Sequence, residues 1–180
     1  MQFCGLQNET LENEMPIHID LRVADCMTRD LVSVNKHSDL TKAIGVMDQK
    51  ILSALPVVDD TGSVCGILSN SDLVRIAYDL QCNVCLLPHV SECVRKSLID
   101  ALAEENEGVE VSSVMTADVE TISENDDIAT AAAKMTACGI HHLPVVDKSR
   151  KPIGIIATTD IVRAVANAGQ TADPVNDPQT

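Results

Sequence analysis

The chain has 180 residues, of which 45% are hydrophobic, and it carries a formal net charge of −14 at pH 7. The apolar fraction is large enough to fill a core, which excludes a wholly disordered chain. The charge argues against a broad nucleic-acid or anionic-membrane surface, because both need clustered Lys and Arg, and a chain with one Tyr, one Phe and no Trp has no aromatic platform for stacking bases.

Residues 1–21 are polar and acidic and are predicted to form a tail. The first basic residue is Arg22, whereas secretory and mitochondrial leaders need basic residues near their start. No stretch approaches the roughly 18 apolar residues of a membrane span. We therefore expect a cytoplasmic protein with no membrane partner. The odd number of cysteines, 7, disfavours a disulfide framework.

The next segment, residues 22–80, alternates strand and helix signals. Apolar residues at helical spacing behind Ser38 or Asp39 predict a capped helix. The turn signature of residues 59–62, Asp-Asp-Thr-Gly, predicts a hairpin between two apolar runs. The order β-α-β-β-α follows. The predicted elements are a strand over residues 31–34, a helix over 39–47, strands over 54–58 and 64–68, and a helix over 69–80.

Residues 81–108 are predicted to form a helical linker, because apolar residues recur at helical spacing after Pro88. The linker also contains thiol and imidazole side chains of the kind that bind zinc. Their spacing is tighter than that of common zinc sites, and the same positions fall on one helical face, so core packing competes with a metal or redox site. The residues concerned are Cys82, Cys85, His89 and Cys93.

The rest of the chain repeats the first part. Residues 23–75 align with residues 111–163 without a gap, so residues 109–168 predict a second β-α-β-β-α unit. Strands this short cannot bury both faces alone, and we expect the two copies to pack sheet to sheet around one shared core. Residues 169–180 have the composition of a disordered tail.

Four motifs occur in the same order in both copies. Val-x-x-x-Met-Thr is followed by Leu-Pro-Val-Val-Asp and then by Gly-Ile, with an Asp-apolar-Val-Arg run closing each copy at residues 72–75 and 160–163. The ordered set resembles the CBS domain, named after cystathionine beta-synthase, and two such units in one chain resemble a Bateman module. The resemblance implies an α/β (α+β) fold of two tandem units related by a pseudo-two-fold axis. It also implies clefts between the units that often hold AMP, ADP, ATP or S-adenosylmethionine.

The resemblance further implies which residues would contact such a ligand. The family's Gly-φ-φ-Ser/Thr-x-Ser/Thr-Asp element, in which φ is apolar, uses its Asp to accept hydrogen bonds from the ribose hydroxyls, while the adenine lies against the other copy. Residues 66–72 carry the complete element, whereas Ala157 replaces the first hydroxyl in copy two, so we expect the cleft at Asp72 to be preferred. The implied first site is Ile67, Ser69, Ser71, Asp72, Ser112, Ala117 and Ile140. The implied second site is Ala24, Arg29, Leu52, His141, Ile155, Thr159 and Asp160.

Simpler interpretations stay open. Ser71, Asp72, Thr159 and Asp160 stand where helix caps belong, and capping alone is worth about 1 kcal/mol each. The sequence contains no catalytic set, Walker loop or dinucleotide fingerprint, so we expect no enzymatic activity. The predicted function is a regulatory signal-transduction module, a homodimer that senses energy state through an adenosine nucleotide and acts on an unknown protein partner. The alternatives are a ligand-free interaction module and a metal or thiol redox protein.

Overall fold

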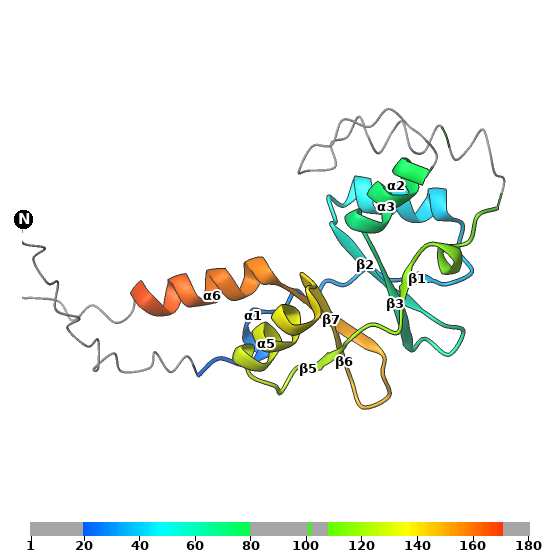
Figure 1. The fold of residues 1–180 in the computed structure, drawn as a ribbon. Helices are drawn as coiled ribbons and strands as arrows, with labels where there is room; N and C mark the ends of the chain where they lie inside the picture. The colour runs from blue at the N-terminus through cyan, green and yellow to red at the C-terminus, as the bar shows by residue number, and fades with distance from the viewer. Residues whose placement is uncertain (1–19, 80–100, 102–107, 171–180) are drawn as a thin grey trace, which may run out of the picture.

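The computed structural model describes residues 20–79, 101 and 108–170. They form two lobes that lie next to each other (Figure 1), each with a small β-sheet and its own helices. Lobe 1 comprises β1 (Val34–Asn35), α2 (Leu40–Gln49), β2 (Ala54–Val58), β3 (Val64–Ser69), α3 (Asn70–Asp79), the 3-10 turn η1 (Val111–Ser113) and β4 (Thr116–Ala117). Lobe 2 comprises α1 (Val23–Cys26), β5 (Ile122–Ser123), α5 (Ile128–Cys138), β6 (His142–Val146), β7 (Pro152–Ala157) and α6 (Thr158–Gln170).

Each lobe is built around one hairpin and two helices, in the predicted order β-α-β-β-α, so the predicted fold class is confirmed. β2 and β3 pair antiparallel, and β1 joins β2 in parallel after the crossover through α2. The cap of α2 is Asp39, whose carboxylate accepts a hydrogen bond from the Lys42 amide. The first strand is shorter and later than the predicted 31–34, because only Val34 and Asn35 pair with β2.

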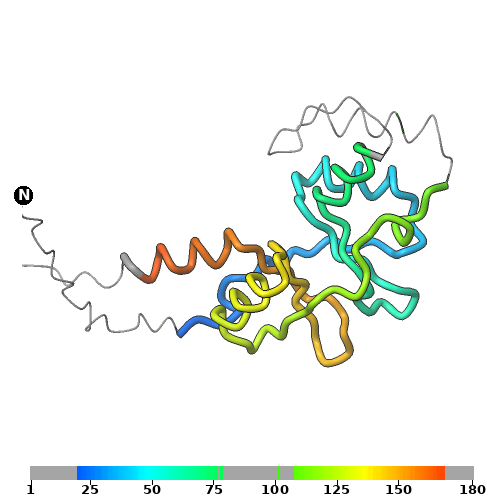
Figure 2. Tube along the Cα trace, in the orientation of Figure 1, coloured from blue at the N-terminus to red at the C-terminus, as the bar shows by residue number. Residues whose placement is uncertain are grey.

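The two repeats exchange their first residues. β4, at the start of repeat two, pairs antiparallel with β3 and completes the sheet of lobe 1. In the same way Thr28, at the start of repeat one, bridges Ile155 in β7 of lobe 2, with both backbone hydrogen bonds formed. Figure 2 shows the result: the blue beginning of the described chain lies in lobe 2, and the green segment after residue 108 lies in lobe 1. Neither lobe is therefore formed by one repeat alone.

The Gly-Ile and Met-Thr pairs that both repeats share have a packing reason. A Cβ on Gly66 would lie 2.6 Å from Met115 Sδ and 2.8 Å from the Thr116 carbonyl oxygen. Gly154 is in the same position relative to Met27 and Thr28, at 2.8 and 2.9 Å. Glycine at these two positions lets the exchanged segment approach the strand closely enough to pair with it.

The core is divided between the lobes, and the expectation of one shared core is wrong. The exchanged segment adds apolar side chains to each sheet, so each lobe buries its own cluster against its own helices. Val111 is fully buried in the first cluster and Val23 in the second. The first cluster is Leu40, Ala43, Ile44, Met47, Leu55, Val57, Leu68, Leu73 and Val111. The second is Val23, Met27, Ile122, Ala131, Met135, Leu143, Val145 and Ile156.

Three predictions concern residues that the structure does not describe or describes only in part. The amino-terminal tail over residues 1–19, the linker residues 80–100 and 102–107, and the carboxyl-terminal residues 171–180 lie outside the described residues. The predicted disordered tail over 169–180 begins too early, because α6 continues to Gln170. Within the described residues, no helix has the length and apolar character needed to cross a membrane.

Candidate functional site

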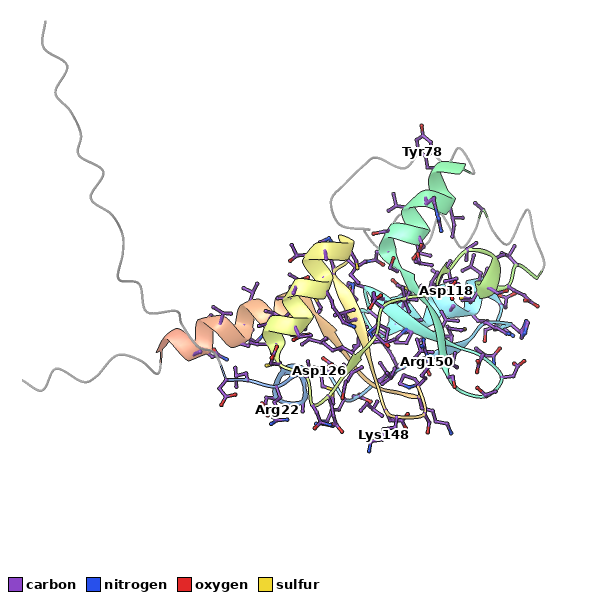
Figure 3. All side chains as sticks on the ribbon, turned by 60° about the horizontal axis from the view of Figure 1, so that its bottom comes forward. Arg22, Tyr78, Asp118, Asp126, Lys148 and Arg150 are labelled. Carbon is purple, nitrogen blue, oxygen red and sulfur yellow. The ribbon has the colours of Figure 1, made fainter. Side chains whose placement is uncertain are left out.

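A cavity of about 540 Å³ opens between the two lobes. Its walls come from the end of β3 and the start of α3 in lobe 1, from the segment that follows β4, and from the turn between α5 and β6 in lobe 2. Asp118 lies where that segment crosses between the lobes (Figure 3). The lining residues are Ser53, Ile67, Ser69, Asn70, Ser71, Asp72, Thr116, Ala117, Asp118, Val119, Glu120, Cys138, Gly139, Ile140, His141 and His142.

Asp72 is the most elaborately held of these side chains and is only 5% exposed. One carboxylate oxygen accepts hydrogen bonds from the Ser69 amide and the Ser69 hydroxyl, at 2.8 and 2.6 Å. The other accepts from Thr116 Oγ1 at 3.0 Å and from Arg75 Nη2 at 3.2 Å. The carboxylate thus has about four acceptor positions and four donors. It also lies in the first turn of α3, where a negative charge is favourable.

Asp160 occupies the corresponding place in lobe 2 but has fewer donors. It accepts from the Ala157 amide at 2.8 Å and from Arg163 Nη1 at 3.2 Å. Ala157 has no hydroxyl to offer, and no bond from Thr28 to this carboxylate is formed within the part of the chain that is described. The same sequence position therefore has a saturated carboxylate in one lobe and a partly satisfied one in the other.

The cavity brings together every residue of the implied first site except Ser112. Ile67, Ala117 and Ile140 form apolar parts of the wall beside Asp72. Ser112 lies in η1, where its amide donates to the Lys36 carbonyl and its hydroxyl donates to Glu110. Ser112 therefore lies beside the loop before α2 and not at the cavity, because the exchanged segment contacts that loop before it reaches β4.

The implied second site is less well assembled around a cavity. Arg29 is held by Glu124 at 3.2 Å and by the Ala24 carbonyl oxygen at 3.4 Å, so its guanidinium is already bonded. Ile155 lies in β7 opposite Thr28. Thr159 and Asp160 lie in the first turn of α6, and Leu52 precedes β2. None of these residues lines the cavity at Asp72.

His141 and the neighbouring His142 differ from the sequence expectation. The resemblance places His141 in the second site; in the structure it lines the cavity at Asp72 and also a smaller cavity of about 260 Å³ that the start of α6 borders. His142 Nε2 shares a hydrogen bond of 2.9 Å with the Ser53 hydroxyl, which joins the lobes. Burial lowers the pKa of His142 below its usual value, and nearby His141 lowers it further, while Asp160 partly opposes both effects.

Sequence reasoning missed several residues of the cavity wall. Thr116 could have been found, because it belongs to the Met-Thr pair that both repeats share. Asp118 could also have been found, because Asp30 stands at the same place in repeat one, two residues after the Met-Thr pair. Ser53, Glu120, Cys138 and His142 belong to no repeated motif that would single them out. Only the arrangement of the lobes places them at the cavity.

The redox and metal alternative depends on residues that are not described. Cys82, Cys85, His89 and Cys93 all lie outside the described residues. Within the described residues, no group of three or more potential metal ligands is formed. Burial raises the pKa of the Cys26 and Cys65 thiols, with neighbouring carboxylates adding to the effect, so these two cysteines are poor thiolate nucleophiles.

Comparison with known proteins identifies both repeats. A family model described as the CBS domain matches residues 23–79 and 111–167, together well over half of the chain. A CBS domain-containing protein of Dictyostelium discoideum is 30% identical over 140 residues, which cover 78% of this chain and 88% of that protein. The match therefore includes both repeats and nearly the whole of that relative.

Other relatives are much longer than this chain. A homoserine O-acetyltransferase of Methanococcoides burtonii is 29% identical over 143 residues, which cover 79% of this chain and 24% of that protein. The chain spans the same share, 24%, of the next two curated relatives. The similarity therefore concerns one part of each of those proteins.

Among solved structures, that of CBSX2 in complex with AMP resembles this fold with a TM-score of 0.62 and 25% sequence identity. The match covers 82% of this chain and 98% of that chain. The arrangement of both lobes is thus shared with a protein that has been crystallised with a nucleotide.

Proposed function

Because this chain belongs to the CBS domain family, whose model matches both of its repeats, we propose that it is a regulatory module that binds an adenosine-containing ligand between its lobes. The candidates are AMP, ADP, ATP and S-adenosylmethionine. The single observation that carries the proposal is the cavity of about 540 Å³ at Asp72, because it has the size of a small-molecule site and is walled by both lobes.

The walls offer separate places for the parts of a nucleoside. Ile67, Val119 and Ile140 supply apolar surface for a purine ring. Asp72 and the hydroxyls around it supply hydrogen-bonding groups for a ribose. The AMP complex of CBSX2, which shares the fold at 25% identity, supports the assignment of an adenosine ligand.

Ribose binding at Asp72 requires an exchange of donors. All four acceptor positions of the carboxylate are occupied, two by the hydroxyls of Ser69 and Thr116. Hydroxyl groups rotate freely and can turn to other acceptors, whereas the Ser69 amide is fixed by the backbone. The ribose hydroxyls therefore replace the two side-chain hydroxyls, and Ser69 and Thr116 turn toward the ligand.

A ligand in this cavity acts on the arrangement of the lobes. It contacts α3 from lobe 1 and the α5–β6 turn from lobe 2, so it stabilises the arrangement that presents both walls. A partner protein is then regulated if it binds differently to this arrangement of the lobes and to the arrangement without ligand. This mechanism needs no chemical step, in keeping with a sensor rather than an enzyme.

The test is a thermal-shift and calorimetric comparison of the four candidate ligands on wild type, Asp72→Asn and Asp160→Asn. We expect at least one ligand to raise the melting temperature of wild type. Asp72→Asn should reduce that rise by more than half, whereas Asp160→Asn should leave the rise unchanged. Because Asp72 is buried, each rise is measured from the variant's own ligand-free melting temperature. Absence of heat and of any shift with all four ligands contradicts the proposal, and loss of the effect in Asp160→Asn alone moves the site to the other lobe.

One observation favours an interaction module as the second candidate. Helix α6 projects from lobe 2 (Figure 1) and exposes apolar side chains, with Val162 62% and Val165 44% exposed. A partner complex that survives Asp72→Asn and is lost in Val162→Asp would favour this second function over the ligand sensor.

A further inference from the structure

The walls of the cavity at Asp72 carry an unbalanced set of charges. Three of the described lining residues bear carboxylates, namely Asp72, Asp118 and Glu120. No lining residue is Lys or Arg. A phosphorylated ligand would therefore bring its negative charges to a wall with three carboxylates, of which Asp72 and Glu120 are in ion pairs and Asp118 is in none that the described residues form. At the separations possible in a cavity of this size, about 10 Å or less, such charges still interact in physiological salt.

Two cations form ion pairs with carboxylates of the wall. Arg75 Nη2 lies 3.2 Å from Asp72 and donates to the Val114 carbonyl at 2.8 Å. Lys134 Nζ lies 3.2 Å from Glu120 and donates to the Thr121 carbonyl at 2.9 Å. Both cations thus compensate carboxylates of the wall, and neither is itself a lining residue. Asp118 is exposed and has no ion pair within the described part of the chain.

The remaining sources of positive potential are weak at neutral pH. His142 has a lowered pKa, so its imidazole is uncharged there, and its Nε2 is engaged by Ser53. The amino-terminal end of α3 lines the cavity, and the Asp72 carboxylate in its first turn offsets part of the positive potential of that end. The other imidazole of the described wall is that of His141, which is exposed.

We infer that this cavity selects adenosine ligands whose 5′ substituent is neutral or cationic over those that carry a 5′ phosphate, with Asp118 and Glu120 as the residues that set the preference. The inference rests on the proposed function and narrows its ligand class from nucleotides to nucleosides with an uncharged or positively charged 5′ group. A sulfonium or thioether nucleoside meets this requirement, whereas ADP and ATP meet it least.

The experiment uses two matched pairs of probes in isothermal titration calorimetry at pH 7.5. 5′-Methylthioadenosine and AMP contain the same adenosine group, but the 5′ substituent is a neutral thioether in the first and a phosphate in the second. S-adenosylmethionine and S-adenosylhomocysteine differ in the sulfonium charge. We expect 5′-methylthioadenosine to bind about tenfold more tightly than AMP, since one unfavourable charge contact at the cavity wall is worth about that factor. S-adenosylmethionine should bind more tightly than S-adenosylhomocysteine. The difference in affinity within each pair of probes should become smaller at high salt.

Asp118→Asn and Glu120→Gln test the residues that set the preference. Each should raise the affinity for AMP several-fold and leave that for 5′-methylthioadenosine within twofold. Asp118 has a φ of 51°, a conformation that Asn also adopts readily, so the variant keeps the backbone. Asp30 is the position of repeat one that corresponds to Asp118, and Asp30→Asn is the matched control that should change neither affinity.

The outcomes separate the inference from the function on which it rests. Tighter binding of AMP than of 5′-methylthioadenosine, with both lost in Asp72→Asn, overturns the charge preference and leaves the sensor function in place. An unchanged ratio in Asp118→Asn and Glu120→Gln overturns the assignment to those residues. Failure of all four probes to bind overturns the charge preference, and it overturns the sensor function as well if ADP and ATP also fail to bind.

Discussion

Ile51 adopts the left-handed conformation, with a φ of 54°, directly after Lys50, the C-cap of helix α2. The corresponding residue in repeat two is Gly139, which ends α5 with a φ of 64°. Glycine is the usual residue in this position, because a β-branched side chain crowds the backbone there. The Ile51 side chain is 88% exposed, so it gains no packing in return. The two repeats thus end equivalent helices with a left-handed residue, and the conformational free energy of that residue is less favourable for Ile51 than for Gly139.

We predict that Ile51→Gly stabilises the protein by about 1 kcal/mol, because it relieves a left-handed β-branched residue without removing a buried contact. In thermal unfolding the melting temperature should rise by a few degrees. Ile51→Val keeps both the branch and the conformation and is the matched control. A lower melting temperature for Ile51→Gly than for Ile51→Val would show that the side chain contributes packing that outweighs the strain.

At the scale of elements, the contact between β3 and β4 links the core of lobe 1 to the cavity. β4 pairs with β3 at Gly66 and Ile67, and Thr116 in β4 reaches Asp72 at 3.0 Å. Any side chain on Gly66 would collide with the Thr116 carbonyl, a backbone atom that cannot rotate away. Separation of β4 from β3 therefore removes both a strand of the sheet and a wall of the cavity.

Gly66→Ala is expected to destabilise the protein by about 2 kcal/mol or more, since a Cβ 2.8 Å from a backbone oxygen forces β4 away. It should also abolish any ligand-induced thermal shift. Gly45 lies inside α2, and a Cβ added there would meet no atom within 4 Å, so Gly45→Ala is the matched control and should stabilise by about 0.5–1 kcal/mol. Equal stability of Gly66→Ala and wild type would mean that β4 is not held against β3 in solution.

At the scale of the whole molecule, the exchanged segments make the lobes interdependent. Val23 and Met27 belong to repeat one but are buried in the core of lobe 2, and Val111 belongs to repeat two but is buried in lobe 1. A single repeat would leave its own sheet without these residues. The pair should therefore unfold as one cooperative unit, and a ligand at the cavity between the lobes acts on both. The homodimer remains a prediction.

The hydrogen bond between His142 and Ser53 makes the contact between the lobes sensitive to pH. The folded-state pKa of His142 is lowered, chiefly by burial, so the unfolded chain binds its proton more readily than the folded protein does. The stability that follows from neutral His142 is complete above the unfolded-state pKa of about 6.5, and it is lost as the pH falls through the interval between that value and the lower folded-state pKa.

The free energy of unfolding of wild type should therefore fall from pH 7.5 to pH 5.5 by more than that of His142→Gln, as measured by urea denaturation. Ser53→Ala is the control, because it removes the hydrogen bond and leaves the buried imidazole. It should cost about 1 kcal/mol or less at both pH values and retain the pH dependence. The same pH dependence in His142→Gln and wild type would assign the effect to other groups.

The sequence alone determined the repeat, the element order and the family. These features follow from local patterns: apolar spacing, turn residues such as those of 59–62, and motifs recurring without a gap. Part of the wall around Asp72 was also predictable, because Ile67, Ala117 and Ile140 stand at fixed positions relative to those motifs. The limits of the first strand were less predictable, because pairing with β2, and not composition, decides which residues form it.

Only the tertiary structure decided how the repeats combine. The exchange of Val23 and Val111 between lobes, the division of the core, and the placement of His141 at the cavity all depend on contacts between residues nearly 90 positions apart. The charge of the cavity wall belongs to the same category, because only the crossing of one segment between the lobes brings Asp118 and Glu120 to the cavity. A sequence records which side chains the chain can offer, whereas packing determines which of them face the same space.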